Sequence, residues 1–340
     1  MSSRKIGIVG LGYAVGSGVR TNNDPVFDWL RNHEIANKKL FTGYKNRAVL
    51  ENGETVDGIM TLAASNALKQ AKMKASDIDL IVGYASISKY LTPNALSEVH
   101  RALGMSEHCW ILPVQSEYTN YLAGLRIANS MITTGDAKNV LLVCGTNWTR
   151  HVDYHQAASI SVGDGACAAV ISKTSDGTRF SVIDSATLCA TKWYGSMDMS
   201  PREIVSPETP SAESPFVRLG AYTKPVFNLD PDEGVKAFKE FGVNAPPELA
   251  LSLIESNNLK PDDVTVISHQ ASGVLLDAWR NKIKPKQYLD TMAEWGNMTL
   301  ASMGVTLASK FDEIETNYLV LLGIGVQQET SAVLLNRRAT

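Results

Sequence analysis

Short apolar runs alternate along this chain with longer segments in which apolar residues recur every three or four positions. The apolar runs predict buried strands, at residues 5–10, 80–84, 140–144, 168–171, 264–267, 318–322 and 331–335. Between them, residues 54–73 carry Ile59, Ala63, Ala67 and Ala71 four residues apart, which is typical of an amphipathic helix. Further helices are expected at residues 120–133, 248–256 and 298–311. The alternation predicts an α/β fold in which helices cover layered sheets.

An internal repeat organises these elements into two halves. Residues 73–86 align without gaps on residues 259–272, because both contain a helix end, an acidic turn, a strand and a loop ending in Ala-Ser. Residues 121–124 similarly parallel residues 299–302 at the start of a helix rich in small residues. The repeat predicts two copies of one α/β unit, at residues 1–172 and 173–340, packed face to face with a site at their seam.

Two polar residues in the last quarter of the chain are candidates for that site. His269 and Asn297 each lie where a strand is expected to end and a helix to begin. A helix start offers free backbone N–H groups, and two neutral donors there can bind a carbonyl oxygen and stabilise negative charge on it. The alternative is that both are satisfied turn or cap residues, since Asn commonly caps helices. In the duplicated layout Tyr118 and Asn297 face each other from two buried helix starts, and His269 reaches in from a strand end.

Composition excludes several classes of protein. With 340 residues, 44% hydrophobic residues, 20% charged residues and a net charge of −3, the chain is an ordinary globular protein of two-domain size. It lacks the basic excess of a nucleic-acid-binding protein. No apolar run approaches the roughly 20 residues that cross a bilayer, and the first residues contain no signal-peptide segment. We therefore predict a cytoplasmic protein.

Neither metal nor cofactor binding is expected. The four cysteines, Cys109, Cys144, Cys167 and Cys189, form no CxxC pair, and the histidines lack ligand spacing. The spaced glycines Gly7, Gly10 and Gly12 resemble a dinucleotide-binding motif that follows a strand. No helix is expected directly after them, so they do not indicate a dinucleotide site. We predict no metal and no bound cofactor.

Several motifs in order resemble those of the ketoacyl synthase III group, the FabH-like ketosynthases and acyltransferases of the thiolase superfamily. They are Thr42-Gly43-Tyr44-Lys45-Asn46-Arg47 with Glu54-Thr55-Val56, then Gly163-Asp164-Gly165-Ala166, His269-Gln270-Ala271 and Gly296-Asn297. The resemblance covers nearly the whole chain and implies a thiolase-like fold of two duplicated α/β halves in αβαβα layers. It also implies that His269 and Asn297 bind the thioester carbonyl of a malonyl unit and stabilise the enolate left by loss of CO2.

The chain departs from this family at the nucleophile. Members carry a cysteine at the start of the first central helix, where it takes the acyl group as a thioester. Here residues 109–135 align without gaps on that region, and Tyr118 holds the cysteine position. A phenol with a pKa near 10 stays protonated at neutral pH. Tyr118 is therefore a hydrogen-bond donor, a plug at the end of the acyl pocket, or a nucleophile if its surroundings lower its pKa. Ser116 and Glu117 are nearby alternatives that precede the helix start.

Other departures concern the acyl donor. An aromatic residue and two arginines cradle coenzyme A in the usual synthases, and the corresponding positions hold Asn37, Phe41 and Val274. The glycine-rich loop near the C-terminus is reduced to Gly323-Ile324-Gly325. The sequence therefore assigns no cofactor-binding residues, and it leaves open whether the substrate is an acyl-coenzyme A or an acyl carrier protein thioester.

Two functions follow from the resemblance. The first is an atypical acyltransferase or condensing enzyme of specialised metabolism that acts on acyl thioesters without a cysteine. The second is a catalytically silent subunit that pairs with an active, cysteine-bearing homologue. Retention of His269 and Asn297 favours the enzyme, because unpaired polar groups in a buried seam are destabilising. A small-molecule binder and a hydrolase remain further alternatives. The family implies a homodimer or heterodimer, but the acyl chain, acceptor and pathway are not encoded in any motif.

Overall fold

Ten strands form the scaffold of the protein. The computed structural model describes residues 5–33, 40–51, 53–174, 179–203 and 223–337. The sheet order is β12-β11-β13-β14-β8-β1-β7-β6-β4-β5. The strands of the first half are β1 (Lys5–Val15), β4 (Leu80–Ser86), β5 (Trp110–Pro113), β6 (Asn139–Thr146) and β7 (Gly165–Thr174). Those of the second half are β8 (Phe180–Cys189), β11 (Val264–Ser268), β12 (Gln287–Leu289), β13 (Tyr318–Ile324) and β14 (Glu329–Arg337).

The two halves share one strand topology. In each half the spatial order is third, second, fourth, fifth and first strand: β5-β4-β6-β7-β1 and β12-β11-β13-β14-β8. The second strand pairs in parallel with the third and fourth, whereas the fifth is antiparallel to its neighbours. The halves meet where Ile8 of β1 lies opposite Phe180 of β8. This repetition supports the expected duplication. The boundary between residues 172 and 173 stays a prediction, and β7 continues past it to Thr174.

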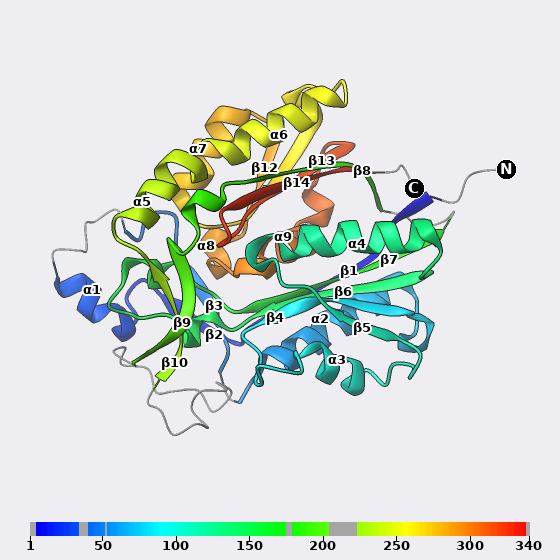
Figure 1. Ribbon diagram of the computed structural model, residues 1–340, viewed down its shortest axis with the longest axis horizontal. Coiled ribbons are helices and arrows are strands. Elements are labelled where there is room, and N and C mark those ends of the chain that lie inside the picture. The colour runs from blue at the N-terminus through cyan, green and yellow to red at the C-terminus, as the bar shows by residue number, and fades with distance from the viewer. Residues whose placement is uncertain (1–4, 34–39, 52, 175–178, 204–222, 338–340) are drawn as a thin grey trace.

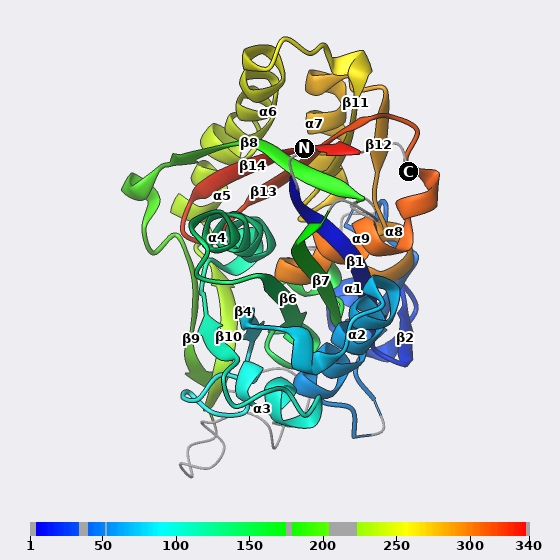
Figure 2. The ribbon, with the colours of Figure 1, turned by 90° about the vertical axis from the view of Figure 1, so that its right-hand side faces the viewer.

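Helices form two outer layers and one central layer (Figure 1, Figure 2). They are α2 (Val56–Ala71) and α3 (Leu96–Ala102) on the first half, α4 (Asn120–Thr134) and α9 (Ser302–Ser309) between the halves, and α6 (Ala245–Ser256) and α7 (Gly273–Ile283) on the second half. One hydrophobic core fills the central layer, with Leu142 from the first half and Leu321 from the second half in the same cluster. The layered α/β architecture expected from the sequence is confirmed.

Smaller elements surround this core. They are β2 (Gly18–Thr21) paired with β3 (Asn46–Val49), β9 (Met197–Glu203) paired with β10 (Thr223–Leu229), and the short helices α1 (Asp28–Asn32), α5 (Glu233–Ala237) and α8 (Met292–Trp295). Across the described ranges, no helix has the length and apolar character needed to cross a membrane.

Each central helix begins with a short 3-10 turn. Residues 117–119 precede α4 and residues 299–301 precede α9, and Glu117 and Thr299 share a left-handed backbone, with φ of 41° and 42°. The structural repeat therefore pairs Glu117 with Thr299 and Tyr118 with Leu300. The pairing of residues 121–124 with 299–302 expected from the sequence is wrong by four residues. A helix presents the same face about every 3.6 residues, so a displacement of one turn preserves the small-residue pattern.

The central layer is packed tightly enough that one methyl group should disturb it. A Cβ added at Gly304 of α9 would lie 2.4 Å from Sγ of Cys167 in β7. We expect Gly304→Ala to lower the free energy of unfolding by about 1–3 kcal/mol, because overpacking forces backbone or side-chain shifts. Gly242→Ala is the matched control, since its Cβ would come no closer than 3.6 Å to Ile324. Urea denaturation measures both, and equal stabilities would contradict the tight contact between the halves.

Candidate active site

The three candidate side chains line one cavity at the seam between the halves. The cavity has a volume of about 340 Å³, and its wall includes Tyr118, His269 and Asn297. Within the part of the chain that the structure describes, no Lys, Arg, Asp or Glu side chain contributes to this wall. Most of the other side chains that line the cavity are apolar. The larger ones include Trp148, Met197, Phe227, Phe238, Leu275 and Ile324. The site therefore offers neutral polar groups in an apolar surrounding.

His269 is held rigidly and buried without a polar partner. It follows Ser268, the last residue of β11, and its backbone N–H donates to the Leu322 carbonyl at 2.8 Å. The side chain is completely buried, and neither ring nitrogen forms a hydrogen bond to the described residues. A neutral imidazole carries one N–H donor and one acceptor, and a buried unsatisfied group costs about 1–3 kcal/mol. The ring is thus available to a bound molecule.

Burial also fixes the charge of His269. Removal from water lowers the pKa of this imidazole from 6.5 to about 4, because the charged form loses its hydration. The nearby backbone of Thr299 raises the pKa of His269 slightly and so offsets part of this lowering. It does not lie in hydrogen-bond geometry with the ring. His269 is therefore neutral at pH 7 and can donate one N–H without introducing a positive charge.

Asn297 combines a structural role with a free donor. Its Oδ1 accepts a hydrogen bond at 2.9 Å from the N–H of Thr299, the first residue of the 3-10 turn before α9. Its backbone N–H donates to Ser161 at 2.6 Å, and its carbonyl accepts from Gly163 at 2.9 Å. Asn297 is therefore a cap residue, as one of the two expectations had it, and the cap is formed by its Oδ1. No described residue accepts from Nδ2, which leaves this donor for the cavity that Asn297 lines.

Tyr118 stands directly against His269. The two rings are stacked, with centroids 4.6 Å apart and an angle of 5° between their planes. The phenol ring also meets Trp148 edge-on, with ring centroids 5.4 Å apart. Burial and, secondarily, the Glu117 carboxylate raise the pKa of Tyr118 well above 10. The lowered pKa required for a phenolate nucleophile is therefore absent, and Tyr118 presents a neutral phenol.

The neighbouring alternatives point elsewhere. The Glu117 carboxylate accepts hydrogen bonds from Ser86 Oγ and Gln115 Nε2, each at 3.2 Å, and burial raises its pKa. Ser116 donates to Glu329 at 2.8 Å. Neither Ser116 nor Glu117 lies among the residues around the cavity.

The positions that correspond to the coenzyme A cradle are apolar where they are described. Phe41 packs edge-on against Phe27, with ring centroids 5.7 Å apart. Val274 lies in the first turn of α7, 70% exposed, and belongs to the cavity wall. Asn37 lies outside the described residues. In the reduced C-terminal loop, Gly325 reaches the cavity.

One part of the cavity wall comes from strands that the sequence did not predict. Met197 of β9 and Phe227 and Leu229 of β10 line it, but no strands were expected there. Pro201 lies inside β9 and argues against a strand in a sequence. One feature of the sequence does indicate the second strand: Phe227 and Leu229 are two residues apart, a spacing that puts both side chains on one face of a strand.

The described residues contain no group of three or more His, Cys, Asp and Glu side chains arranged to hold a metal ion. Cys109, Cys144 and Cys167 are buried thiols, and Cys189 is exposed.

Comparisons with known proteins find similar synthases. Residues 114–190 match the 3-oxoacyl-(acyl-carrier-protein) synthase III family. A curated relative, the β-ketoacyl-(acyl-carrier-protein) synthase III of Fusobacterium nucleatum, is 25% identical over 321 residues, which cover 91% of each chain.

Solved structures show the same fold. The 3-oxoacyl-(acyl-carrier-protein) synthase III of Aquifex aeolicus superposes with a TM-score of 0.80 at 22% identity, covering 97% of this chain and 99% of its own. The priming β-ketosynthase of the R1128 polyketide biosynthetic pathway gives a TM-score of 0.82 at 21% identity, covering 99% and 98%. These similarities confirm the thiolase-like fold expected from the sequence.

The buried imidazole should make stability depend on pH. Unfolding returns the pKa of His269 from about 4 to 6.5, so the unfolded chain binds an extra proton between these values and the folded protein loses stability as the pH falls. Relative to pH 7.5, we expect a loss of about 2 kcal/mol at pH 5 that His269→Phe does not show.

Urea denaturation of both proteins at the two pH values measures this difference. Asp164 contributes with the opposite sign, because burial raises its pKa to about 6, but it is present in both proteins and cancels in the comparison. The same pH dependence in wild type and variant would contradict a neutral, desolvated imidazole.

Proposed function

We propose that this chain, a FabH-like relative of the ketoacyl synthase III family within the thiolase superfamily, is an acyltransferase or condensing enzyme that works without a cysteine nucleophile. Its substrate is an acyl thioester. The observation that carries the proposal is the fully buried imidazole of His269, which has no hydrogen-bond partner among the described groups and lines the same cavity as Asn297. Buried polar groups without hydrogen-bond partners lower the stability of the fold, and a substrate carbonyl that accepts from His269 and Asn297 would restore part of it.

The pair acts on a carbonyl oxygen. A thioester placed in the cavity accepts hydrogen bonds from the neutral imidazole N–H of His269 and from Nδ2 of Asn297. Negative charge that develops on this oxygen is stabilised more strongly here than in water, because no charged side chain among the described residues competes for it and the surrounding is apolar. The same arrangement stabilises an enolate that remains when a malonyl-type thioester loses CO2.

Tyr118 separates this site from that of a cysteine enzyme. Its phenol is neutral, so the acyl group moves directly between bound partners. The acceptor attacks the thioester carbonyl, the C–S bond breaks, and the acceptor proton leaves with the thiol. Positioning two reactants in one cavity supplies much of the rate for such a step. The ring of Tyr118 fixes one face of His269 and directs the imidazole edge toward the substrate.

The acyl donor is a carrier-protein thioester. The relatives that match the chain are synthases whose names specify acyl carrier protein. Phe41 and Val274 hold positions at which the usual synthases cradle coenzyme A with arginines, which disfavours coenzyme A itself. These departures support a role in specialised metabolism, and the R1128 priming β-ketosynthase, whose structure the chain resembles, comes from a polyketide biosynthetic pathway.

A dimer is proposed for the active form. The strand β5 ends the sheet, and Trp110 at its start is 54% exposed. An unpaired edge strand with an exposed aromatic residue favours pairing with a second chain. The second candidate function uses the same surface: a silent subunit joined to a cysteine-bearing homologue. The phenol ring at the nucleophile position favours that alternative, and the open cavity with its unpaired His269 disfavours it.

The purified protein alone should turn over acyl or malonyl carrier-protein thioesters. We expect His269→Ala and Asn297→Asp each to lower kcat by about 10²–10³, because each removes one donor to the developing oxyanion. Asn297→Asp retains an oxygen to cap the Thr299 N–H, so it tests the Nδ2 donor apart from the turn. Release of free thiol measures the rate.

Two controls accompany this assay. His100→Ala removes a histidine that contacts Ser106 outside the cavity, and alkylation of the exposed Cys189 modifies a thiol; both should leave turnover unchanged. Equal rates for wild type and His269→Ala would exclude the enzyme. Absent turnover together with a stable heterodimer would establish the silent subunit instead.

Intact-mass spectrometry separates direct transfer from an acyl-enzyme. Wild-type protein incubated with an acyl carrier-protein thioester should show no added acyl mass, since the Tyr118 phenol stays protonated. Tyr118→Cys should gain one acyl group, because it places a thiol at the start of a buried helix, where the N-terminus favours a thiolate. An acylated wild-type protein that becomes unmodified in Tyr118→Phe would identify the phenol as a nucleophile and refute direct transfer.

A further inference from the structure

A carboxylate from the second half of the chain reaches the turn that carries Tyr118. Oε1 of Glu329 accepts a hydrogen bond from Ser116 Oγ at 2.8 Å and another from Thr119 Oγ1. The two hydroxyl groups also contact each other at 2.7 Å. Glu329 lies more than 200 residues along the chain from both donors. A single oxygen therefore ties down the residues on both sides of the pair Glu117-Tyr118.

This turn has a conformation that needs such support. Glu117 has φ of 41°, which a residue with a side chain adopts at a cost of about 1–3 kcal/mol unless its surroundings impose it. The Ser116 N–H is held by Oδ1 of Asn120 at 3.0 Å, and the Glu117 carboxylate is held by Ser86. Among the described residues, Glu329 is the second-half side chain that hydrogen-bonds to this turn. Hydrogen bonds to a carboxylate are stronger than those between neutral groups.

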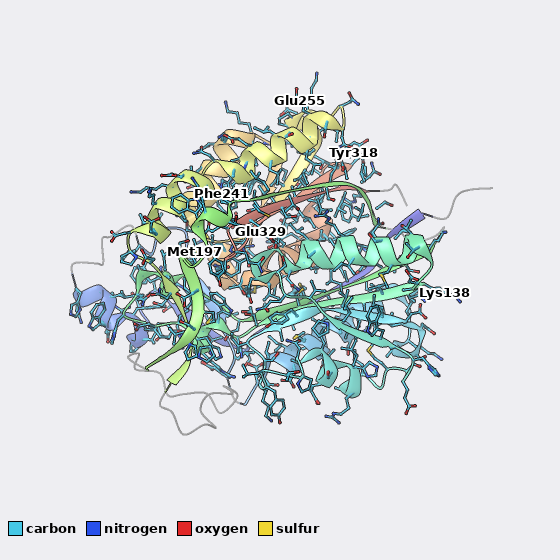
Figure 3. The ribbon with its side chains drawn as sticks, viewed as in Figure 1. Lys138, Met197, Phe241, Glu255, Tyr318 and Glu329 are labelled. Atoms are coloured by element: carbon cyan, nitrogen blue, oxygen red, sulfur yellow. The ribbon has the colours of Figure 1, made fainter. Side chains whose placement is uncertain are left out.

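Glu329 also closes a second turn that lines the cavity. Its backbone carbonyl accepts from the Gly325 N–H at 2.7 Å, and the Gln328 N–H donates to Gly325 at 3.0 Å. Gly325 and Gln328 both line the cavity. Figure 3 shows Glu329 near the centre of the molecule, where β14 approaches the start of α4. One residue thus links the turn that carries Tyr118 to the turn of Gly325 and Gln328 in the lining of the same cavity.

We propose that Glu329 is a positioning residue that holds the Tyr118 ring against His269. Its carboxylate fixes Ser116 and Thr119, these fix the strained turn, and the turn directs the phenol ring onto the imidazole at a centroid distance of 4.6 Å. Without the carboxylate the turn relaxes toward an ordinary backbone conformation and the ring leaves the imidazole. The stacking is a property of the resting protein, so this role stands whether or not the proposed acyl transfer occurs.

Histidine NMR tests the role directly. The protein has six histidines, and comparison with His269→Gln assigns the His269 ring protons. A ring stacked on an aromatic face is shielded, so these protons should resonate upfield, and Tyr118→Leu supplies the unstacked reference. We expect Glu329→Ala to move the signal at least half of the way to that reference. Glu329→Gln keeps an acceptor oxygen and should remain close to wild type.

Controls separate positioning from loss of stability. Asp77→Ala removes another turn-holding carboxylate, which accepts from the Lys74 N–H at 2.8 Å, and should leave the His269 signal in place. If Glu329→Ala does not fold, the pair Ser116→Ala and Thr119→Val removes the two donors instead and should give the same downfield movement. An unmoved His269 signal in the folded Glu329→Ala protein, or in the folded double variant, would overturn the proposal.

Discussion

The arrangement of the site depends on an imidazole that is removed from water and left without a protein partner. His269 follows the end of β11, where its backbone N–H is bound to Leu322, and its ring is completely buried against Tyr118. Burial lowers its pKa to about 4 and keeps it neutral. A neutral ring can share an apolar cavity with Asn297 and with the face of Tyr118, whereas an imidazolium there would require a counter-ion. The cavity instead contains neutral hydrogen-bond donors, which we propose act on a carbonyl oxygen.

The architecture and the site were largely predictable because both follow from local periodicity and duplication. Buried strands such as residues 318–322 appear as continuous apolar runs, and α2 shows a helical repeat of alanines. The repeat predicted that Tyr118 and Asn297 face each other from two helix starts and that His269 reaches in from a strand end, and in the structure all three residues line one cavity. Asn297 was expected to be either a helix cap or a ligand-binding group. In the structure its Oδ1 caps the Thr299 N–H, and its Nδ2 is left for the cavity.

Features that depend on contacts between distant residues were not predictable. The part of the cavity wall formed by β9 and β10 was not predicted, because Pro201 within β9 is atypical of a strand. The residue-level pairing of the central helices was wrong by one turn, since helical periodicity is insensitive to such a displacement. The carboxylate of Glu329 gives no sign in the sequence that it meets Thr119. Likewise, only the packed structure shows that burial and Glu117 raise the pKa of Tyr118 rather than lower it.

The most direct test examines whether His269 and Asn297 bind a substrate carbonyl. A pantetheine ketone in which CH2 replaces the thioester sulfur, labelled with 13C at its carbonyl, reports hydrogen bonding to that oxygen through its NMR shift. Bound to the wild-type protein, the carbonyl carbon should move downfield of its position in water, and bound to His269→Ala it should return most of the way. A bound ketone whose carbonyl shift is the same in both proteins would show that the imidazole does not contact the substrate oxygen.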